Sequence, residues 1–427
     1  MYLRKKNKIS IIGLGYVGLP LAIEFNKYHN VIGYDINQQR IFDLNNFLDI
    51  NNEMRSINIK KAIRNNLIFT KDESKISNSS IYIITVPTPI YKNKKPNLTA
   101  IKNSTKLVGN LLEKNNIVIY ESTVYPGLIE EICVPILRKQ SGLKYNLDFF
   151  CGYSPERINP GDTNHSLKNI VKITSGSNSF IASKIDKLYK KIIKAGTYKA
   201  SSIKVAEAAK VIENTQRDIN IAFMNELAKI FYKLNIDSNE VFKAANTKWN
   251  FLNFKPGLVG GHCIGVDPYY LTFQAKKVGF NPDIILSGRK VNDSMGIYLV
   301  QKLISEMKKR KITLVKSRIL IMGLTFKENC SDIRNSKIFD VISKLIKLNC
   351  KVELFDPLIS KNFLIKKYSR YLIKFPKLNS YNVILIAVSH SVFIKLGKKK
   401  IISFGKKNVI IFDLKNIFKN EKLFINF

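Results

Sequence analysis

The sequence of 427 residues is poor in the residues that build disulfides and metal sites, since it has only 5 cysteines and 4 histidines. The cysteines are scattered without a Cys-x-x-Cys pair, which argues against both a disulfide framework and a zinc site. The histidines are likewise not paired at metal-ligand spacing. We therefore expect no bound metal.

Long apolar runs are also lacking, and none is long enough to cross a bilayer. The N-terminal stretch MYLRKKNKISIIGLGYVGLPLAIEF does place basic residues before an apolar run, as a secretory signal peptide would. Its glycines, however, have the spacing of a nucleotide-binding turn. We therefore expect a cytoplasmic protein that does not insert into a membrane.

Acidic residues are scarce, with 32 Asp and Glu against 70 Lys and Arg, so that the formal net charge is +38. Such a charge is typical of proteins that bind nucleic acids or anionic membranes. Here the lysines are spread over the whole chain, and no nucleic-acid-binding motif accompanies them. We attribute the charge to composition and predict no nucleic-acid partner, although it could help to attract an anionic small substrate.

What the sequence does contain begins with a dinucleotide fingerprint. A buried strand over residues 8–12 precedes the motif GLGYVG, in which Gly13, Gly15 and Gly18 have the G-x-G-x-x-G spacing. A helix is expected from about Leu19, and a second strand ends at Asp35. In this order Gly13 permits the tight turn, Gly15 lets a pyrophosphate approach and Gly18 packs helix on strand, while Asp35 would bind ribose hydroxyls and repel a 2′-phosphate. The chain is therefore predicted to bind NAD.

Further buried strands follow and end in loops rich in Pro and Thr. Residues 81–89 and 117–127 carry Thr88, Ser122 and Thr123 at the ends where a parallel sheet holds its ligand. Ser, Thr and Pro serve turns equally well, so these residues are candidates for either role. A third strand in residues 148–161 runs into a loop with Glu156 and Arg157, where its position favours function over a solvated charge pair.

The middle of the chain predicts one long helix over residues 201–235. Lys210 and Asn214 share a face of it, because they are four residues apart. Lys210 could be a surface lysine or could face the site, and the helix could also form a dimer surface. After residue 314 the α/β alternation resumes as a second Rossmann-type sheet without a dinucleotide fingerprint, with expected strands at 318–324, 351–357, 382–388 and 408–414.

A stretch that can carry covalent chemistry lies at residues 259–270, VGGHCIGVDPYY. Glycines before Cys263 let the backbone approach a ligand, and a thiol becomes a nucleophile once a cation or a helix N-terminus lowers its pKa. Asp267, four residues later, could act as a base or position a water. A lone cysteine is usually structural, but the polar groups elsewhere in the chain favour the functional interpretation.

Taken together, these motifs resemble the UDP-glucose/GDP-mannose dehydrogenase family over nearly the whole chain. The matching stretches are GLGYVGLPLA, VPTP, STVYPG, YSPERINPG, AAKVIENTQRDINIA, GGHCIGVDP and GLTFKENCSDIRNS. The family oxidises the C6 hydroxyl of a nucleotide sugar to a carboxylate with two NAD. The resemblance implies two Rossmann-like α/β domains joined by a helical region that dimerises, which places an NAD-binding domain at 1–196, a central domain at 197–296 and a UDP-sugar-binding domain at 297–427.

The resemblance also implies roles for individual residues. Cys263 would trap the aldehyde as a thiohemiacetal and then form a thioester, and Lys210 and Asp267 would handle the proton of the C6 hydroxyl. Lys210 and Asn214 would stabilise the oxyanion, Glu156 would assist thioester hydrolysis and Thr123 would hold the water or hydroxyl. Besides the residues of the fingerprint, NAD would contact Tyr16, Val17, Arg40, Thr88, Ser122 and Arg334. The sugar nucleotide would contact Arg157, Asn159, Phe254, Gly257, Gly260, Lys327 and Lys415.

Within the family, GGHCIGVDPYYL, NPGDTNHSLKNIVK and DLKN resemble the branch that acts on UDP-N-acetylhexosamines of the galactosamine or glucosamine type for bacterial surface polysaccharides. Lys415 stands where UDP-glucose enzymes more often have Arg. UDP-glucose and UDP-N-acetylmannosamine remain alternatives, and the arginine that the family takes from a neighbouring subunit is not placed, although Lys248 or Lys255 could occupy that region.

Two further classes compete with this interpretation. A two-electron dehydrogenase of the β-hydroxyacid type would share the two-domain plan and need a Lys and an Asn on the central helix, but it would leave Cys263 unexplained. A basic binding protein without activity would leave the ordered NAD and active-site motifs unexplained; tight nucleic-acid binding that persists at moderate salt would support it.

Overall fold

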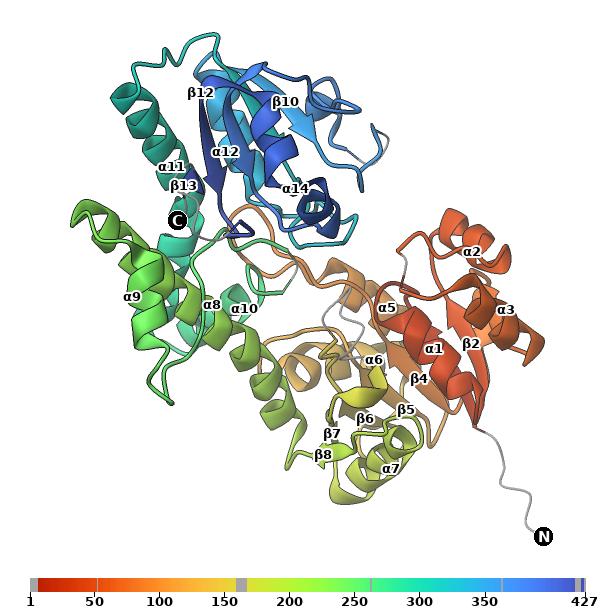
Figure 1. The fold of residues 1–427 in the computed structure, drawn as a ribbon. Coiled ribbons are helices and arrows are strands. Elements are labelled where there is room, and N and C mark those ends of the chain that lie inside the picture. The colour runs from red at the N-terminus through yellow and green to blue at the C-terminus, as the bar shows by residue number, and fades with distance from the viewer. Residues whose placement is uncertain are drawn as a thin grey trace. The chain divides into compact units, whose positions relative to one another are not determined.

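The computed structural model describes residues 7–51, 53–158, 167–261, 263–361, 364–418 and 424–425. The chain divides into two compact units (Figure 1). The first unit combines Met1–Glu213 with Tyr269–Phe280, and the second combines Asn214–Pro268 with Asn281–Phe427. The division into domains 1–196, 197–296 and 297–427 stays a prediction.

The first unit is built on a sheet whose strand order in the described residues is β3-β2-β1-β4-β5-β6-β7-β8. Its neighbouring strands are parallel except for β6 and β7, which pair antiparallel. Since β1 lies between β2 and β4, the chain reverses direction across the sheet at β1, and this switch point is where such sheets hold a ligand. The strands are β1 (Lys8–Ile12), β2 (Asn30–Tyr34), β3 (Ile68–Thr70), β4 (Ile81–Ile84), β5 (Ile117–Tyr120), β6 (Phe150–Tyr153), β7 (Lys172–Gly176) and β8 (Thr197–Lys199).

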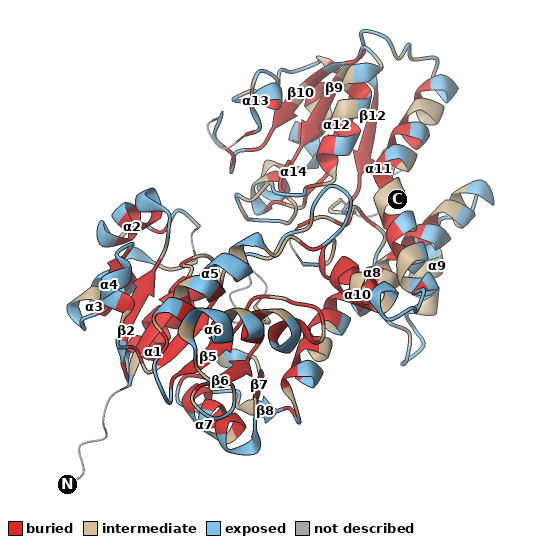
Figure 2. Cartoon of the chain, turned by 180° about the vertical axis from the view of Figure 1, so that it is seen from behind, coloured by how far each residue is buried: buried red, intermediate tan, exposed pale blue. Residues whose placement is uncertain are grey.

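Helices cover both faces of this sheet. Side chains of α1 and α7 join one apolar core with those of β1, β2, β4 and β5, whereas Thr105 of α5 bonds Tyr120 of β5 in a separate buried contact. Apart from the edge strand β8, the strands are buried along almost their whole length, which explains their continuous apolar runs (Figure 2). The helices are α1 (Gly18–Asn26), α2 (Gln38–Asn45), α3 (Ser56–Arg64), α4 (Glu73–Ile76), α5 (Thr99–Asn110), α6 (Val134–Ser141) and α7 (Ser179–Lys190), with a π-helical turn at Ile129–Cys133 and a 3-10 turn at Leu167–Asn169.

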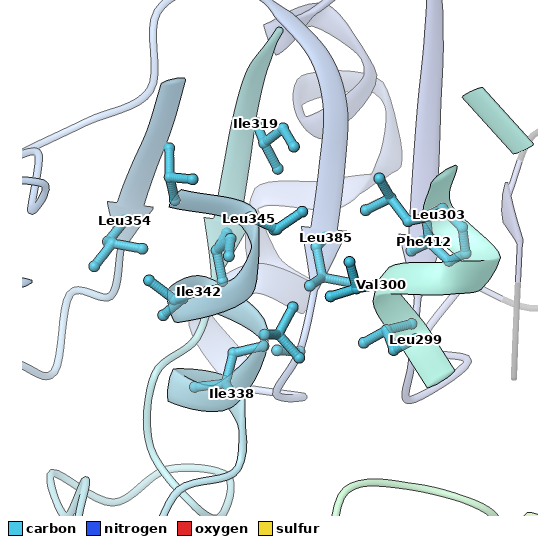
Figure 3. Close-up of a cluster of buried hydrophobic side chains, with 14 of the residues drawn as sticks. Leu299, Val300, Leu303, Ile319, Ile338, Ile342, Leu345, Leu354, Leu385 and Phe412 are labelled. Carbon is cyan, nitrogen blue, oxygen red and sulfur yellow. The ribbon is translucent and has the colours of Figure 1, made fainter. Parts of the chain in front are cut away.

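The second unit contains a parallel sheet of order β10-β9-β11-β12-β13. Alternate residues of its strands enter two different cores, one under α11 and α12 and the other under α14. Figure 3 shows the first of these cores, where Leu303 and Ile342 lie with Leu385 and Phe412. The elements are β9 (Arg318–Met322), α12 (Ile338–Lys347), β10 (Lys351–Phe355), α13 (Lys366–Ser369), β11 (Tyr381–Ile386), α14 (Ser391–Phe404), β12 (Gly405–Asp413) and β13 (Phe424–Ile425).

The long central helix is confirmed as α8 (Ile203–Lys233). It is followed by α9 (Ser238–Ala245), α10 (Asp267–Lys277) and α11 (Asp283–Lys309). The predicted fold class, two Rossmann-like α/β sheets and a long central helix, is therefore confirmed. The strand expected at 8–12 is confirmed as β1, whereas several other expected strands end earlier in the structure; β4, for example, ends at Ile84.

Candidate active site

The glycine-rich turn of the first unit follows β1 directly. Gly13 has φ of 96°, a backbone conformation that disfavours side chains. A Cβ on Gly18 would lie 1.8 Å from the carbonyl oxygen of Gly13, so only glycine lets the start of α1 pack on this turn. By contrast, nothing lies within 4 Å of a Cβ built on Gly15. The turn therefore leaves open space at the N-terminus of α1, next to half-buried Tyr16 and Val17, where a phosphate group fits.

Asp35, directly after β2, fixes the conformation of this turn. One carboxylate oxygen accepts a hydrogen bond of 2.8 Å from the backbone N–H of Leu14, and the other accepts one of 2.9 Å from Asn37. The carboxylate is only half-buried, so lone pairs remain for the hydroxyls of a ribose. These features fit the adenosine half of a dinucleotide, as the sequence predicts.

Arg40 has structural partners that the sequence did not reveal. Its Nε donates to the carbonyl of Leu14 at 2.8 Å, and its Nη1 donates to Asp49 at 2.7 Å in a buried ion pair. The guanidinium thus holds the glycine-rich turn through the carbonyl of Leu14. Among its nitrogens, only Nη2 is left without a hydrogen-bond partner. A contact between Arg40 and NAD stays a prediction.

The loops after β4 and β5 are joined to each other. The Ser122 hydroxyl donates to the carbonyl of Val86 at 2.6 Å, and the Tyr270 hydroxyl contacts the carbonyl of Thr88 at 2.9 Å. Thr88 and Thr123 are half-buried. Ser122 thus has a backbone partner at the ligand edge of the sheet, and the Thr123 hydroxyl lies one residue further along the same loop.

Glu156 is held by three donors at the end of β6. Its Oε1 accepts from the backbone N–H of Arg157 and Ile158, each at 2.7 Å, and its Oε2 accepts from Lys172 at 2.9 Å. Arg157 bonds the carbonyl of Val171 and forms an ion pair of 2.8 Å with Glu213. Asn159 lies outside the described residues.

Polar side chains of α8 face inward over several turns. Lys210 and Asn214, one turn apart, are both buried. Glu207 is completely buried, and its carboxylate accepts from the N–H groups of Gly127 at 2.5 Å and Ile129 at 3.0 Å. Burial raises the pKa of Glu207 to about 8 against the opposing effect of these bonds. Glu207 thereby fastens the loop that carries Thr123 to α8.

Cys263 is exposed and lies just before the N-terminus of α10. The backbone N–H of Asp267, the first residue of α10, donates to the carbonyl of Cys263 at 2.8 Å. The Asp267 carboxylate is buried and accepts a bond of 2.6 Å from the Asn214 amide. The second unit therefore brings together three of the predicted catalytic residues, an accessible thiol, a buried carboxylate and an amide.

Two of the predicted substrate residues line a small hollow in the second unit. Gly260 and Lys415 line it with Leu258, Thr325, Phe326, Ser336, Lys337, Ile338, Ala387, Val388 and Leu414. A Cβ built on Gly257 would lie 3.9 Å from the Lys415 ammonium. Phe254, which precedes Gly257 in the chain, is half-buried. Lys415 has exposed surface, but the atoms packed around its ammonium lower its pKa by desolvation, to which Lys255 adds while Glu328 opposes.

Gly257 is clamped by a side chain that the sequence did not single out. The amide of buried Asn225 accepts from Gly257 N–H at 2.8 Å and donates to its carbonyl at 3.0 Å. Lys337, which lines the hollow, pairs with Asp293 at 2.9 Å. Asn225 lies on α8 and Lys337 directly precedes α12, and the polar pattern of both helices is ordinary. Only their position in the structure therefore identifies them as residues of the site.

Arg334 and Lys327 lie in the loop after β9. Arg334 is exposed and forms a two-pronged ion pair with Asp332. Lys327 is half-buried, and its carbonyl accepts from the Thr325 hydroxyl. Their predicted contacts with NAD and with the sugar nucleotide stay predictions.

Metal-binding clusters and membrane-spanning helices are both absent from the described residues. No group of three or more His, Cys, Asp or Glu there could hold a metal ion. No described helix is long and apolar enough to pass through a membrane.

Models of one protein family match the chain in three consecutive parts. The NAD binding domain of the UDP-glucose/GDP-mannose dehydrogenase family matches residues 7–193, its central domain matches 204–294 and its UDP binding domain matches 320–420. The UDP-N-acetyl-D-glucosamine 6-dehydrogenase of Salmonella typhi is 54% identical over 92% of each chain, and the protein of the same name from Pseudomonas aeruginosa is 53% identical over 93% and 94%. A solved structure, the UDP-D-ManNAc dehydrogenase of Pyrococcus horikoshii, superposes with a TM-score of 0.87 at 27% identity and covers 98% of each chain.

Proposed function

Because the chain belongs to the UDP-glucose/GDP-mannose dehydrogenase family and is thus an NAD-dependent oxidoreductase, we propose that it oxidises C6 of UDP-N-acetyl-D-glucosamine to the carboxylate. The observation that carries the choice of sugar is the identity of 54% and 53%, over nearly the whole chain, to two enzymes named for this substrate. The product would serve the synthesis of a surface polysaccharide. The family, the enzyme class and NAD as cofactor, all expected from the sequence, are confirmed.

The residues around the glycine-rich turn would hold NAD. Gly13, Gly15 and Gly18 form a cradle that a side chain would fill, and the N-terminus of α1 offers N–H groups to the pyrophosphate. Asp35 would accept the ribose hydroxyls. When bound, NAD takes up one hydride in each of two oxidations.

The thiol of Cys263 accounts for the second oxidation. Loss of the first hydride converts the C6 alcohol to an aldehyde. The C–H bond of an aldehyde does not readily release a hydride until a nucleophile has added to the carbonyl carbon. Addition of the Cys263 sulfur gives a thiohemiacetal, and loss of the second hydride leaves a thioester on the enzyme. Water then attacks the thioester carbon, the C–S bond breaks and the carboxylate product leaves.

The neighbouring polar groups have matching tasks. Asp267, oriented by the 2.6 Å bond from Asn214, would accept the proton of the C6 hydroxyl, and Lys210 would assist this transfer by hydrogen bonding to the hydroxyl oxygen. Asn214 has a second N–H, which with the Lys210 ammonium would stabilise the oxyanion. Glu156 would take the proton of the attacking water, and Thr123 would hold that water.

Residues around Gly257, Gly260 and Lys415 in the second unit would bind the sugar nucleotide. Lys415 supplies a cation beside Gly257, and Lys327 lies in the loop after β9. Two cations suit a diphosphate, because each can neutralise one of its charges. Phe254, Gly257 and Gly260 would line the sugar, and Arg157 and Arg334 complete the set of predicted contacts.

The chain would act as a cytoplasmic homodimer. Apolar side chains are exposed along α8, among them Ile212, Phe223 and Ile230. A row of this kind is typical of a surface that a second copy covers. Light scattering coupled to size exclusion would give twice the chain mass of 48.9 kDa.

The test is the yield of NADH with a limiting amount of each UDP-sugar. UDP-N-acetylglucosamine, its galactosamine and mannosamine analogues and UDP-glucose are compared, with wild type and Cys263→Ser. We expect two NADH per UDP-N-acetylglucosamine and no full turnover in the variant. One NADH per sugar, or a fully active Cys263→Ser, would return the chain to the two-electron class.

A further inference from the structure

A buried lysine lies beside Glu156 and has no assigned role. Lys172 is 2% exposed, and its ammonium donates to Glu121 at 2.7 Å and to Glu156 at 2.9 Å. Glu121 is itself 1% exposed and accepts a second bond from the hydroxyl of Tyr189. One ammonium is thus shared by two carboxylates, of which only Glu156 is accessible.

The sheet topology explains how these three residues meet. β5, β6 and β7 lie side by side in the sheet (Figure 1). Glu121 directly follows parallel strand β5, and Glu156 follows β6, so both leave the carboxyl edge of the sheet. β7 runs antiparallel to β6, and it therefore brings its first residue, Lys172, to this same edge. A parallel β7 would have placed the lysine at the opposite edge.

The electrostatics favour a charged group of three. Burial alone would lower the pKa of Lys172, but the two carboxylates outweigh it and raise that pKa. Burial raises the pKa of Glu121, which opposes an ionised carboxylate there. An ammonium within 2.9 Å of two carboxylates is stabilised in its charged form, and it in turn opposes the protonation of Glu121 that burial favours.

Stability does not account for the arrangement. A buried ion pair usually contributes little to folding, because desolvation of both charges offsets their attraction. Here a second carboxylate adds a surplus negative charge to the buried pair. Such a group is understandable where one of its carboxylates has chemistry to perform.

We propose that Lys172, anchored by Glu121, is a positioning residue that keeps Glu156 ionised and oriented for thioester hydrolysis. The proposal rests on the proposed function, in which Glu156 takes a proton from the attacking water. In that step the water oxygen bonds to the thioester carbon, its proton passes to Glu156, and the C–S electrons return to Cys263. A carboxylate that was already protonated could not accept this proton.

The groups that face Glu156 come from several elements. Lys172 and the N–H groups of Arg157 and Ile158 favour the ionised form, while Glu121 disfavours it. The Arg157 guanidinium is occupied by Glu213 of α8 and by the carbonyl of Val171. Lys172 is therefore the cationic side chain bound directly to Glu156 among the described contacts.

The test follows the thioester itself. Enzyme, NAD and UDP-N-acetylglucosamine are mixed and quenched in acid, and the mass of the protein with sugar on Cys263 is followed over time from pH 6 to 10. In Lys172→Met/Glu121→Gln both buried charges are gone. We expect hydrolysis at pH 7 to be at least tenfold slower than in wild type, with recovery as the pH rises.

Three variants test the direction of the effect. Glu121→Gln removes the competing carboxylate, so we expect the acid limb of hydrolysis to move to lower pH than in wild type. Tyr189→Phe removes a hydrogen bond that lowers the pKa of Glu121, so its acid limb should move in the same direction as in Glu121→Gln but by less. Lys172→Arg keeps the cation and should restore most of the rate.

The outcomes separate the two proposals. If wild type fails to release two NADH per sugar, the proposed function is wrong, and this inference falls with it. If wild type does so but the double variant keeps the wild-type pH profile, or is slowed equally at every pH, only the inference is overturned. A shift of the acid limb in the same direction in Glu121→Gln and the double variant would overturn it as well.

Discussion

Replacing Glu207 by Gln should change how the stability of the protein depends on pH. The carboxyl is 0% exposed, and burial raises its pKa from 4.5 to about 8. The folded protein then holds the proton more tightly than the unfolded chain does. This contribution to stability is complete below about pH 4.5, falls as the pH rises and is lost once the pH exceeds about 8.

The size of the effect follows from linkage. At about 1.4 kcal/mol for each pKa unit, a rise from 4.5 to about 8 corresponds to roughly 5 kcal/mol, as an upper bound. Gln resembles the protonated acid, but it has one acceptor oxygen for the N–H groups of Gly127 and Ile129. An unsatisfied buried N–H costs about 1–3 kcal/mol, so Glu207→Gln should be less stable than wild type near pH 5.

Since Gln does not titrate, the deficit should shrink by several kcal/mol towards pH 9 and could change sign. Unfolding of both proteins is measured by calorimetry at pH values between 5 and 9, and the difference between them isolates Glu207 because all other titrations cancel. A difference that stays constant across this range would refute the reasoning. Glu207→Ala provides a control, because it removes both acceptors as well as the charge.

Two further predictions concern the binding sites. Gly18→Ala should abolish NAD binding in calorimetric titration, because a Cβ there would lie 1.8 Å from the Gly13 carbonyl, whereas Gly142→Ala, where a Cβ meets nothing within 4 Å, should bind NAD normally. Asn225→Ala should raise KM for the UDP-sugar at least tenfold with a smaller change in kcat, since it removes both bonds that hold Gly257; an unchanged KM would contradict the clamp.

The parts of the site that were predictable are those fixed by local sequence. The glycine spacing and Asp35 identify the NAD turn, because each residue acts within about 20 positions of the next. Lys210 and Asn214 follow from helical periodicity. Lys172 could not be found in this way, because its partner Glu121 is 51 residues earlier and meets it only through the antiparallel insertion of β7. The ion pair of Arg40 with Asp49 could not be foreseen either, since Asp49 belongs to no motif.

The same type of turn follows the first strand, β1 or β9, in each half of the chain, but its surroundings differ between the two halves. In the second half, Gly323 has φ of 91°, and the Leu324 N–H donates to Asp356 at 2.7 Å, as Leu14 does to Asp35. Asp356 also accepts from the residue two positions on, Leu358, just as Asp35 accepts from Asn37. The acid that marks a dinucleotide fold is therefore present in both halves as a clamp on the turn.

What differs is the surroundings of that acid. Asp35 is half-buried and α1 begins five residues after Gly13, at Gly18, so both ribose and phosphate positions are open. Asp356 is 3% exposed with His390 at 3.3 Å, and His390 also accepts from the N–H of Asn329 at 2.9 Å. The loop 324–337 separates β9 from α12, which begins only at Ile338. Because Asp356 is covered by His390, it is not available to the hydroxyls of a ribose, and in this half the acid serves only the turn.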